Sequence, residues 1–267
     1  MGDINMIFCP LYSGSSGNST FLASDNTKIL VDAGLSGKNI ETALLKIGFN
    51  PNEIDAILVT HEHTDHIKGV GVLSRKYNIP IYANALTWQC MLKYIGKIKE
   101  HNIKVLYNNH ISIKDMDITS FSTSHDAVDP YGYAIDCKNK RACVATDLGF
   151  ISDEIKYILK DSDIILLESN HDVEMLKFGP YPYDLKRRIL SKIGHLSNDD
   201  CGKAILNIIN NKFKKIILGH LSKTNNYPEL AYQTVINTLI EAGVKLNMDV
   251  TISMARRDKP SNYIKFK

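Results

Sequence analysis

Disulfide frameworks and thiolate metal sites both depend on paired cysteines, and this 267-residue sequence has none that are spaced as a pair. Its five cysteines are odd in number, lie scattered along the chain and form no Cys-x-x-Cys motif. This pattern is typical of reduced thiols packed inside a cytosolic fold. We therefore expect a cytoplasmic protein without disulfides.

The sequence also lacks a long apolar run. A membrane span needs about 20 apolar residues, and no stretch approaches that length. The N-terminus does not combine a basic start with an apolar stretch, as a secretion signal would. The net charge of +3 is small, so it permits an acidic substrate without requiring one. We expect no membrane partner, and the oligomeric state stays open.

No Pro/Gly/Ser-rich linker and no internal repeat divides the chain, which predicts one domain over residues 1–267. Short apolar or β-branched runs predict strands at 4–9, 19–23, 28–32, 55–60, 79–83, 118–122, 132–136, 142–146, 163–167, 215–218 and 250–253. Helical periodicity predicts helices at 38–47, 67–77, 86–98, 154–160, 185–193, 199–210 and 230–241. Two β-rich halves with outer helices favour an α/β (α+β) fold, a four-layer αββα sandwich of two mixed β-sheets.

Several of the predicted strands run directly into a polar side chain. These side chains are Asp32, His61, Asp147 and His220. In layered α/β folds, ligand sites form where strand ends meet at one edge. We therefore expect these four residues to converge.

The densest group of potential metal ligands is the run Thr-His-Glu-His-Thr-Asp-His at residues 60–66. His61 and His63 are two apart, so an extended loop would project both imidazoles to the same side, toward one ion. Asp65 and His66 follow at the start of a helical pattern, where a tight turn would direct them to a second point. Such ligands suit zinc, manganese and iron, and the absence of a nearby cysteine argues against a closed structural zinc site. The alternative is a polar loop that is rich in histidine by chance.

This run resembles the H-x-H-x-D-H signature of the metallo-β-lactamase fold superfamily. Its other landmarks follow in the expected order, in Val31-Asp32-Ala33-Gly34, Ser124-His125-Asp126, the run 145–149 and the run 218–222. The resemblance implies this fold and two divalent ions, Zn²⁺ or Mn²⁺, with Fe also compatible. It implies that His125 binds the first ion, Asp147 bridges both and His220 binds the second. Asp32 would hold the metal-binding loop in its orientation without itself binding an ion. Taken singly, each of these residues is more simply read as an ordinary polar side chain.

Two ions about 3.5–4 Å apart can hold a bridging hydroxide, which is the expected nucleophile. We therefore count Asp65 among the candidate catalytic residues as well as among the candidate metal ligands. Glu168 and His195 resemble the Glu/His pair of the ribonuclease Z branch, in which the carboxylate orients a histidine that acts as general acid. The alternative is that His195 merely packs near the helix that starts around Asn198.

A closer resemblance is to the YycJ group, also called WalJ or VicX, and it rests on the runs 13–19, 168–172, 179–183, 185–188 and 194–198. It implies a 5′-to-3′ exonuclease acting on double-stranded DNA. The serine- and glycine-rich run 13–19 could cradle a phosphate through Ser15, although a flexible hairpin is the common reading. Lys186, Arg187 and Arg188 could contact the phosphate backbone, or simply form a solvated helix face. The basic C-terminus is either a solubilising tail or a DNA contact.

Three other functions stay open. An RNA-processing nuclease of the ribonuclease Z type would share the Glu168/His195 pair. A small-molecule hydrolase of lactone, thioester or β-lactam bonds would share the metal ligands but would not need that pair. A non-catalytic or redox module is disfavoured, because the ligand set is intact and the chain leaves no room for a flavin domain. The resemblance favours a nucleic-acid partner, and DNA over RNA.

Overall fold

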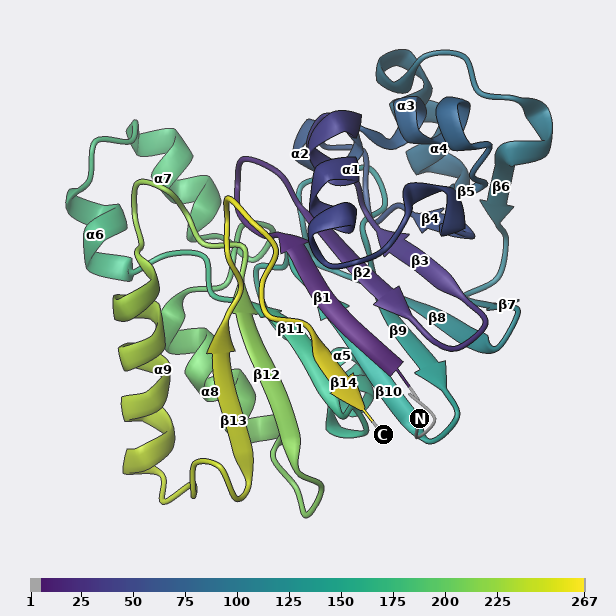
Figure 1. The fold of residues 1–267 in the computed structure, drawn as a ribbon. Helices are drawn as coiled ribbons and strands as arrows, with labels where there is room; N and C mark the ends of the chain where they lie inside the picture. Colours follow the sequence, from purple (N-terminus) through teal and green to yellow (C-terminus); the bar gives the residue numbers. More distant parts are fainter. Residues whose placement is uncertain (1–5, 267) are drawn as a thin grey trace. The chain divides into compact units, whose positions relative to one another are not determined.

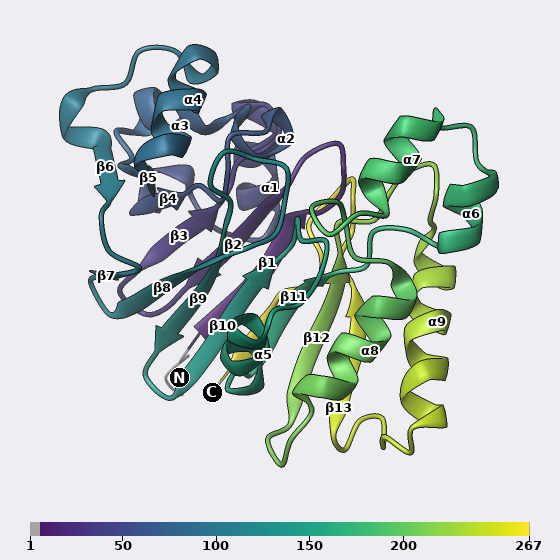
Figure 2. The ribbon, with the colours of Figure 1, turned by 180° about the vertical axis from the view of Figure 1, so that it is seen from behind.

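A computed structural model describes residues 6–266 (Figures 1 and 2). Ile4 and Asn5 of the predicted first strand lie outside these residues, as does Lys267 of the basic C-terminus. The contacts divide the chain into two compact units. Unit 1 comprises Met1–Ser122, Ala127–Lys140 and Arg256–Lys267, and unit 2 comprises Thr123–Asp126 and Arg141–Ala255. The single domain over residues 1–267 stays a prediction, which unfolding experiments can test.

Unit 1 is built on a sheet with the strand order β14-β1-β2-β3-β4-β5-β6. Pairing is antiparallel from β14 to β3 and parallel from β3 to β6. A further group, β7-β8-β9, is antiparallel. The strands of unit 1 are β1 (Met6–Tyr12), β2 (Ser19–Ala23), β3 (Lys28–Val31), β4 (Ala56–Leu58), β5 (Ile81–Asn84), β6 (Ile103–Leu106), β7 (His110–Ile113), β8 (Met116–Ser122), β9 (Tyr131–Cys137) and β14 (Ile264–Phe266).

The helices of unit 1 cover one face of its sheet. They are α1 (Gly37–Lys46), the short α2 (Thr64–Ile67), α3 (Val70–Tyr77) and α4 (Ala85–Ile95), with 3₁₀ turns η1 (Pro51–Glu53) and η2 (Glu100–Asn102). Helix α1 shows why this face is buried: Ile40, Ala43 and Leu44 recur at helical spacing and enter one core cluster with Phe21 and Leu30 of the sheet. The apolar stripe therefore fixes the helix against the sheet that carries the candidate site.

Unit 2 contains the parallel strands β10 (Lys140–Ala145), β11 (Ile164–Glu168), β12 (Lys214–Gly219) and β13 (Val250–Met254). Its helices are α5 (Asp153–Lys160), α6 (Val173–Phe178), α7 (Tyr183–Ile189), α8 (Asn198–Ile208) and α9 (Pro228–Glu241). Every residue of β11 is buried, as expected for a central parallel strand that is covered on both faces. Ser197 caps α8 by accepting a hydrogen bond from the backbone N–H of Asp200, and Gly243 follows α9 with φ 78°.

The predicted helix 67–77 is wrong as one element, because the structure has two helices with a break at residues 68–69. Gly69 N donates to Ala33 O at 2.7 Å, and a Cβ at Gly69 would stand 2.4 Å from Leu35 O. The predicted helix 185–193 ends early, at Ile189. A Cβ at Gly194 would stand 2.2 Å from Ile189 O. In both places a close approach of backbone segments interrupts the helical pattern.

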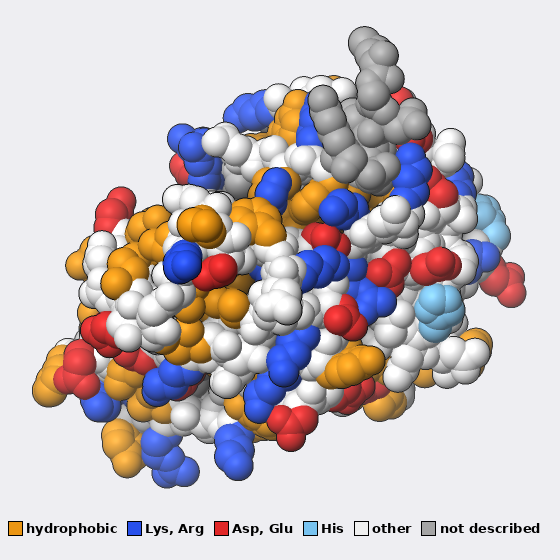
Figure 3. All heavy atoms as spheres, turned by 90° about the horizontal axis from the view of Figure 1, so that it is seen from below, with side chains coloured by type: hydrophobic (Ala, Val, Ile, Leu, Met, Phe, Trp, Pro, Cys, Tyr) orange, Lys and Arg blue, Asp and Glu red, His pale blue; other side chains and the backbone are white. Residues whose placement is uncertain are grey.

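The other predicted elements are present with shifted ends, while β6, β7, β14 and α6 were not predicted. The α/β class with mixed sheets flanked by helices is confirmed. All five cysteines are free thiols, as expected. Among residues 6–266, no helix has the length and apolar character needed to cross a bilayer. On the face drawn in Figure 3, Lys and Arg side chains are interspersed with Asp and Glu side chains, so this face carries charges of both signs.

Candidate metal centre

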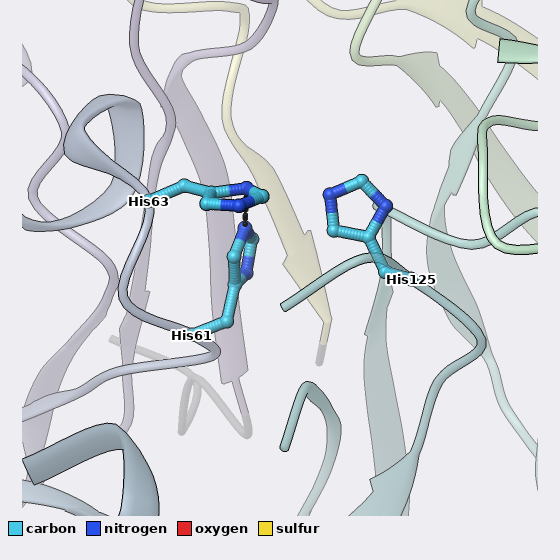
Figure 4. Close-up of side chains that lie close together, drawn as sticks. All are labelled: His61, His63 and His125. Carbon is cyan, nitrogen blue, oxygen red and sulfur yellow. Dashed lines mark hydrogen bonds between the residues drawn. The ribbon is translucent and has the colours of Figure 1, made fainter. Parts of the chain in front are cut away.

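The histidines of the run 60–66 lie on the loop that follows β4 and on the first turn of α2. His61 is buried and His63 is half-buried. His61 Nε2 lies 3.1 Å from His63 Nδ1, and Figure 4 marks this contact with a dashed line. Two nitrogen ligands at about 2.0–2.1 Å from a tetrahedral zinc are separated by roughly 3.3 Å. The spacing of these two nitrogens therefore fits a shared ion.

Asp32 lies behind this loop and fixes its histidines. One carboxylate oxygen accepts the Thr60 N–H at 2.8 Å, and the other lies 2.7 Å from His66 Nδ1. A carboxylate accepts, so His66 Nδ1 carries the proton and Nε2 is the nitrogen with ligand character. Thr60 Oγ1 donates to Asp32 at 2.8 Å and lies 3.0 Å from His61 Nδ1. The same tautomer therefore follows for His61, and Thr60 is a positioning residue that the sequence did not reveal.

Asn18 is a second residue of this cluster that sequence reasoning missed. It is buried, and its side-chain Nδ2 lies 3.4 Å from Asp65 Oδ2 and 3.1 Å from His66 Nε2. Its backbone N donates to Asp65 O at 2.8 Å. Ser15, which the sequence singled out in the same run, is exposed. An amide is not a typical metal ligand, and so the only signal in the sequence was the proximity of Asn18 to the serine- and glycine-rich run.

In unit 2 the candidate residues gather at the carboxyl ends of neighbouring parallel strands. Asp147 follows β10, Glu168 ends β11 and His220 follows β12, and these strands are paired in register. Asp147 and His220 have positive φ values of 57° and 53°, and Asp32 in unit 1 has 61°. This left-handed backbone costs about 1–3 kcal/mol at a non-glycine residue and is concentrated at functional sites. Within each unit, the expected convergence of strand ends is therefore observed.

The carboxylate of Asp147 presents one oxygen to each of two histidines. Its Oδ1 lies 3.7 Å from His125 Nε2, and its Oδ2 lies 3.2 Å from His220 Nδ1. His125 Nδ1 lies 3.1 Å from the carbonyl oxygen of Gly194, so Nδ1 carries the proton and Nε2 has ligand character. Burial lowers the pKa of His125, which favours the neutral ring that binds metals. This arrangement suits a carboxylate that bridges two ions.

Buried Glu168 and half-buried His195 form a hydrogen-bonded pair beside this carboxylate. Glu168 Oε1 lies 2.8 Å from His195 Nδ1, and Oε2 accepts the N–H groups of Leu148 and Leu196 at 3.0 and 3.2 Å. Burial alone would lower the pKa of His195, but the charge and hydrogen bond of Glu168 outweigh it and raise that pKa to about 9. Asp147 Oδ1 lies 4.0 Å from His195 Nδ1. The pair therefore favours the protonated form of the His195 ring.

Potential ligand atoms of Asp147, Glu168, His195 and His220 all lie within 4.8 Å of one another. Both oxygens of Glu168 already accept hydrogen bonds. The geometry therefore favours Asp147 and His220 as ligands and Glu168 as the residue that orients His195. Imidazole and carboxylate groups held this close together fit a divalent ion.

A network of buried amides that the sequence did not reveal supports this edge of unit 2. Asn170 Nδ2 donates to the His220 carbonyl at 2.8 Å, which holds the left-handed backbone there. Asn226 Nδ2 donates to the carbonyls of Ser169 and Asn170 at 3.0 Å. His171 is also buried, and neither ring nitrogen has a hydrogen-bond partner among residues 6–266. Burial lowers its pKa to about 4, so the ring is neutral.

The basic run of the sequence lies on α7. Lys186 is half-buried, whereas Arg187 and Arg188 are exposed. Arg188 forms an ion pair with Asp126 Oδ2, and Asp126 Oδ1 lies 3.3 Å from His125 Nε2. The last turn of α7 therefore reaches the residue next to a candidate ligand.

The family profile described as "Metallo-beta-lactamase superfamily" matches residues 12–220. The chain belongs to this superfamily. Within the superfamily it is 46% identical over 255 residues to "Exodeoxyribonuclease WalJ" of Streptococcus pneumoniae, which covers 94% of this chain and 95% of that one. It is 45% identical over 237 residues to "Exodeoxyribonuclease YycJ" of Bacillus anthracis, which covers 88% of this chain and 90% of that one. The predicted kinship to the YycJ and WalJ group is confirmed.

A solved structure supports the fold assignment. The metallo-beta-lactamase fold protein YhfI from Bacillus subtilis superposes with a TM-score of 0.73 at 15% identity, covering 98% of this chain and 99% of that one. The predicted metallo-β-lactamase fold is confirmed, and members of this superfamily are divalent-metal proteins.

Proposed function

We propose that this protein is a two-metal phosphodiesterase that degrades double-stranded DNA in the 5′-to-3′ direction. The observation that carries the proposal is the Glu168–His195 pair beside Asp147. A leaving alkoxide needs a proton, and an imidazole with a pKa of about 9 holds one at neutral pH. Hydrolysis of a lactone or β-lactam would not need such a pair.

The predicted enzyme class, a metal-dependent hydrolase of the nuclease kind, is confirmed by the superfamily and by two relatives named as exodeoxyribonucleases. Those names are the reason to favour DNA over RNA as the substrate. The cytoplasmic location expected from the scattered cysteines is part of this proposal.

The metal ligands in this proposal come from the sequence motifs. His61, His63 and His125 would hold the first ion, Asp65, His66 and His220 would hold the second, and Asp147 would serve both. Zn²⁺ and Mn²⁺ both suit such a set of nitrogen and oxygen ligands. Bound divalent ions supply the nucleophile by lowering the pKa of a water to about 7.

The residues of the chain supply the rest of the chemistry. His195 delivers its proton to the leaving oxygen, and Glu168 holds the imidazole ring and stabilises its protonated form. Asp32 and Thr60 fix the tautomers of His61 and His66, so that Nε2 of each ring is the unprotonated nitrogen that would bind a metal. Ser15, Lys186, Arg187 and Arg188 are the proposed contacts to the phosphate backbone.

One side-by-side digestion tests the proposal. End-labelled duplex DNA, single-stranded DNA and RNA are incubated with the protein and Mn²⁺ or Zn²⁺, with His63→Ala protein as the inactive control. We expect duplex DNA to shorten from its 5′ ends and the control to leave it intact. Preferential cleavage of RNA would support the ribonuclease Z type of function instead. Rapid hydrolysis of a lactone or thioester with no nucleic acid cleaved would overturn the proposal.

A further inference from the structure

Helices α6 and α7 form a hairpin in unit 2, beyond the carboxyl ends of β11 and β12 (Figures 1 and 2). Lys186 Nζ donates to the carbonyl oxygen of Lys177 at 2.8 Å, which ties α7 to the end of α6. The connecting residues 179–182 include two prolines, which restrict the turn. The hairpin is therefore a defined element of unit 2.

Two large aromatic side chains flank this turn and are exposed to solvent. Phe178 ends α6 with 84% of its surface exposed, and Tyr183 begins α7 with 73% exposed. A single exposed aromatic residue is unremarkable, and Tyr157 on α5 is another at 72%. What sets this pair apart is its position, because the two residues flank the same turn, five positions apart, in a basic stretch of the sequence.

The hairpin is one of the basic stretches of a nearly neutral chain, as is the C-terminus. Residues 173–192 contain five Lys or Arg and two Asp or Glu, a local charge of +3 that equals the net charge of all 267 residues. Arg187 and Arg188 line an open hollow of about 340 Å³ together with Asp184, Ser191 and Ile193. Cationic side chains beside exposed aromatic rings match a strand of nucleic acid, whose phosphates are negative and whose bases stack.

The hairpin is also connected to the candidate site of unit 2. Arg188, at the end of α7, pairs with Asp126, which lies next to the candidate ligand His125. Tyr183 precedes Arg188 by five residues, which is about 7.5 Å along a helix axis. One strand of stacked DNA advances by about 3.4 Å per nucleotide. The start of α7 at Tyr183 is therefore about two nucleotide steps along the helix axis from its end at Arg188.

We infer that the α6–α7 hairpin is a binding platform for the unpaired end of a nucleic acid strand, where bases stack on Phe178 and Tyr183 and phosphates contact Arg187. This inference rests on the proposed function and adds to it the part of the substrate that is recognised. Base pairs inside a duplex hide their faces, so only frayed or overhanging bases offer a ring to an aromatic side chain. The platform therefore selects strand ends over duplex interiors.

Binding measurements on the full chain with the inactivating substitution His63→Ala test this inference. Fluorescence anisotropy compares duplex DNA that has a short unpaired end with the same duplex made blunt, and 2-aminopurine in the unpaired end reports stacking. Phe178→Ala and Tyr183→Ala should each weaken binding of the unpaired end about 10-fold and relieve the quenching of 2-aminopurine. Phe178→Trp, which keeps an aromatic face, should retain both properties.

Two further variants separate stacking from charge. Tyr157→Ala removes an equally exposed ring from α5 in the same unit and should change binding less than about 2-fold. Arg187→Gln should weaken both DNAs and reduce the slope of log K against log salt by about 1. Hydrolysis of a small phosphodiester such as bis-p-nitrophenyl phosphate by otherwise native protein should be unchanged in Phe178→Ala and Tyr183→Ala.

The outcomes distinguish the platform from the proposed function. If the protein binds and degrades DNA while Phe178→Ala and Tyr183→Ala bind the unpaired end as tightly as the parent, the platform is wrong and the nuclease assignment stands. If the parent binds neither DNA, both are wrong. Equal losses with Tyr157→Ala would also overturn the platform, because the effect would then not depend on position.

Discussion

The two units assemble their candidate ligands in opposite ways. In unit 1 the ligands His61, His63, Asp65 and His66 come from six consecutive positions on one loop and one helical turn. In unit 2 the residues are far apart in sequence: Asp147 and His220 meet because the parallel strands before them end at one edge, and His125 joins them from the segment after the antiparallel strand β8. The first cluster depends on local spacing, whereas the second depends on topology, and beside the second lies the Glu168–His195 pair, whose histidine is positioned to act as an acid.

The largest effect should come from removing a ligand in either unit. His63→Ala and Asp147→Asn should each lower kcat/KM on DNA at least about 10,000-fold, as happens when residues act as one catalytic unit. If ligands from both units serve the same pair of ions, the double variant should be no worse than either single variant. Metal content by mass spectrometry and exonuclease rates measure this. The control Asp153→Asn changes an exposed carboxylate on α5 and should be neutral.

Losses that multiply in the double variant would contradict the proposal. Such a result would mean that the cluster of unit 1 and the cluster of unit 2 contribute independently. It would therefore separate a two-metal centre from two unrelated sites.

The next effect should belong to unit 2 alone. His195→Gln should lower kcat about 100- to 10,000-fold while the metal content stays the same. The acid is active when protonated, so the kcat of the parent should fall as the pH rises through about 9. Glu168→Gln removes the negative charge that raises this pKa, and the alkaline decline should move to lower pH. Asp32→Asn in unit 1 should leave the position of that decline unchanged.

A pH–rate profile of kcat for the four proteins provides the measurement. If the alkaline limb of Glu168→Gln coincides with that of the parent, another group titrates and His195 is not the acid. If His195→Gln loses metal together with activity, His195 is a ligand, and the contrast between the two units disappears.

Smaller losses should come from residues that position the ligands. Asp32→Asn puts a donor NH2 in place of one of the two oxygens that accept from Thr60 and His66, and it should weaken metal binding about 10- to 100-fold. Asn170→Ala acts only through the backbone of His220, so its effect should lie near the lower end of that range. Competition with a chromophoric chelator measures both, and Asn108→Ala on an exposed loop is the control. Equal binding by Asp32→Asn and the control would show that the tautomer of His66 is fixed by other groups.

The same contrast between units explains what could be predicted from the sequence. The cluster 61–66 was visible because its ligands are adjacent. Asp147 and His220 were visible as polar residues at strand ends, but their roles as ligands, and His125 itself, came only from their order in a known family. Asn18 and Asn170 escaped notice because an amide carries no ligand chemistry, and their roles depend on backbone groups distant in sequence. The break at Gly69 was missed because it depends on backbone groups that are distant in sequence.

The missed strands β6, β7 and β14 are short and lie at the ends of their strand groups in unit 1. Each therefore has too few residues to show a clear strand pattern.

The smallest effect tests whether the two units fold as the one domain predicted over residues 1–267. Ser36 caps α1 in unit 1 by accepting the Asn39 N–H, and Ser152 caps α5 in unit 2 by accepting the Ile155 N–H. Losing such a cap costs about 1 kcal/mol, which corresponds to a shift in Tm of about 2–4 °C for a chain of this size. If the chain is one cooperative domain, Ser36→Ala and Ser152→Ala should shift the same calorimetric transition by similar amounts.

Two transitions, each moved by only one of the two variants, would mean that the units unfold separately. The interleaving of unit 1 with unit 2 along the chain argues for the cooperative outcome, since unit 1 is complete only when segments on both sides of unit 2 have folded.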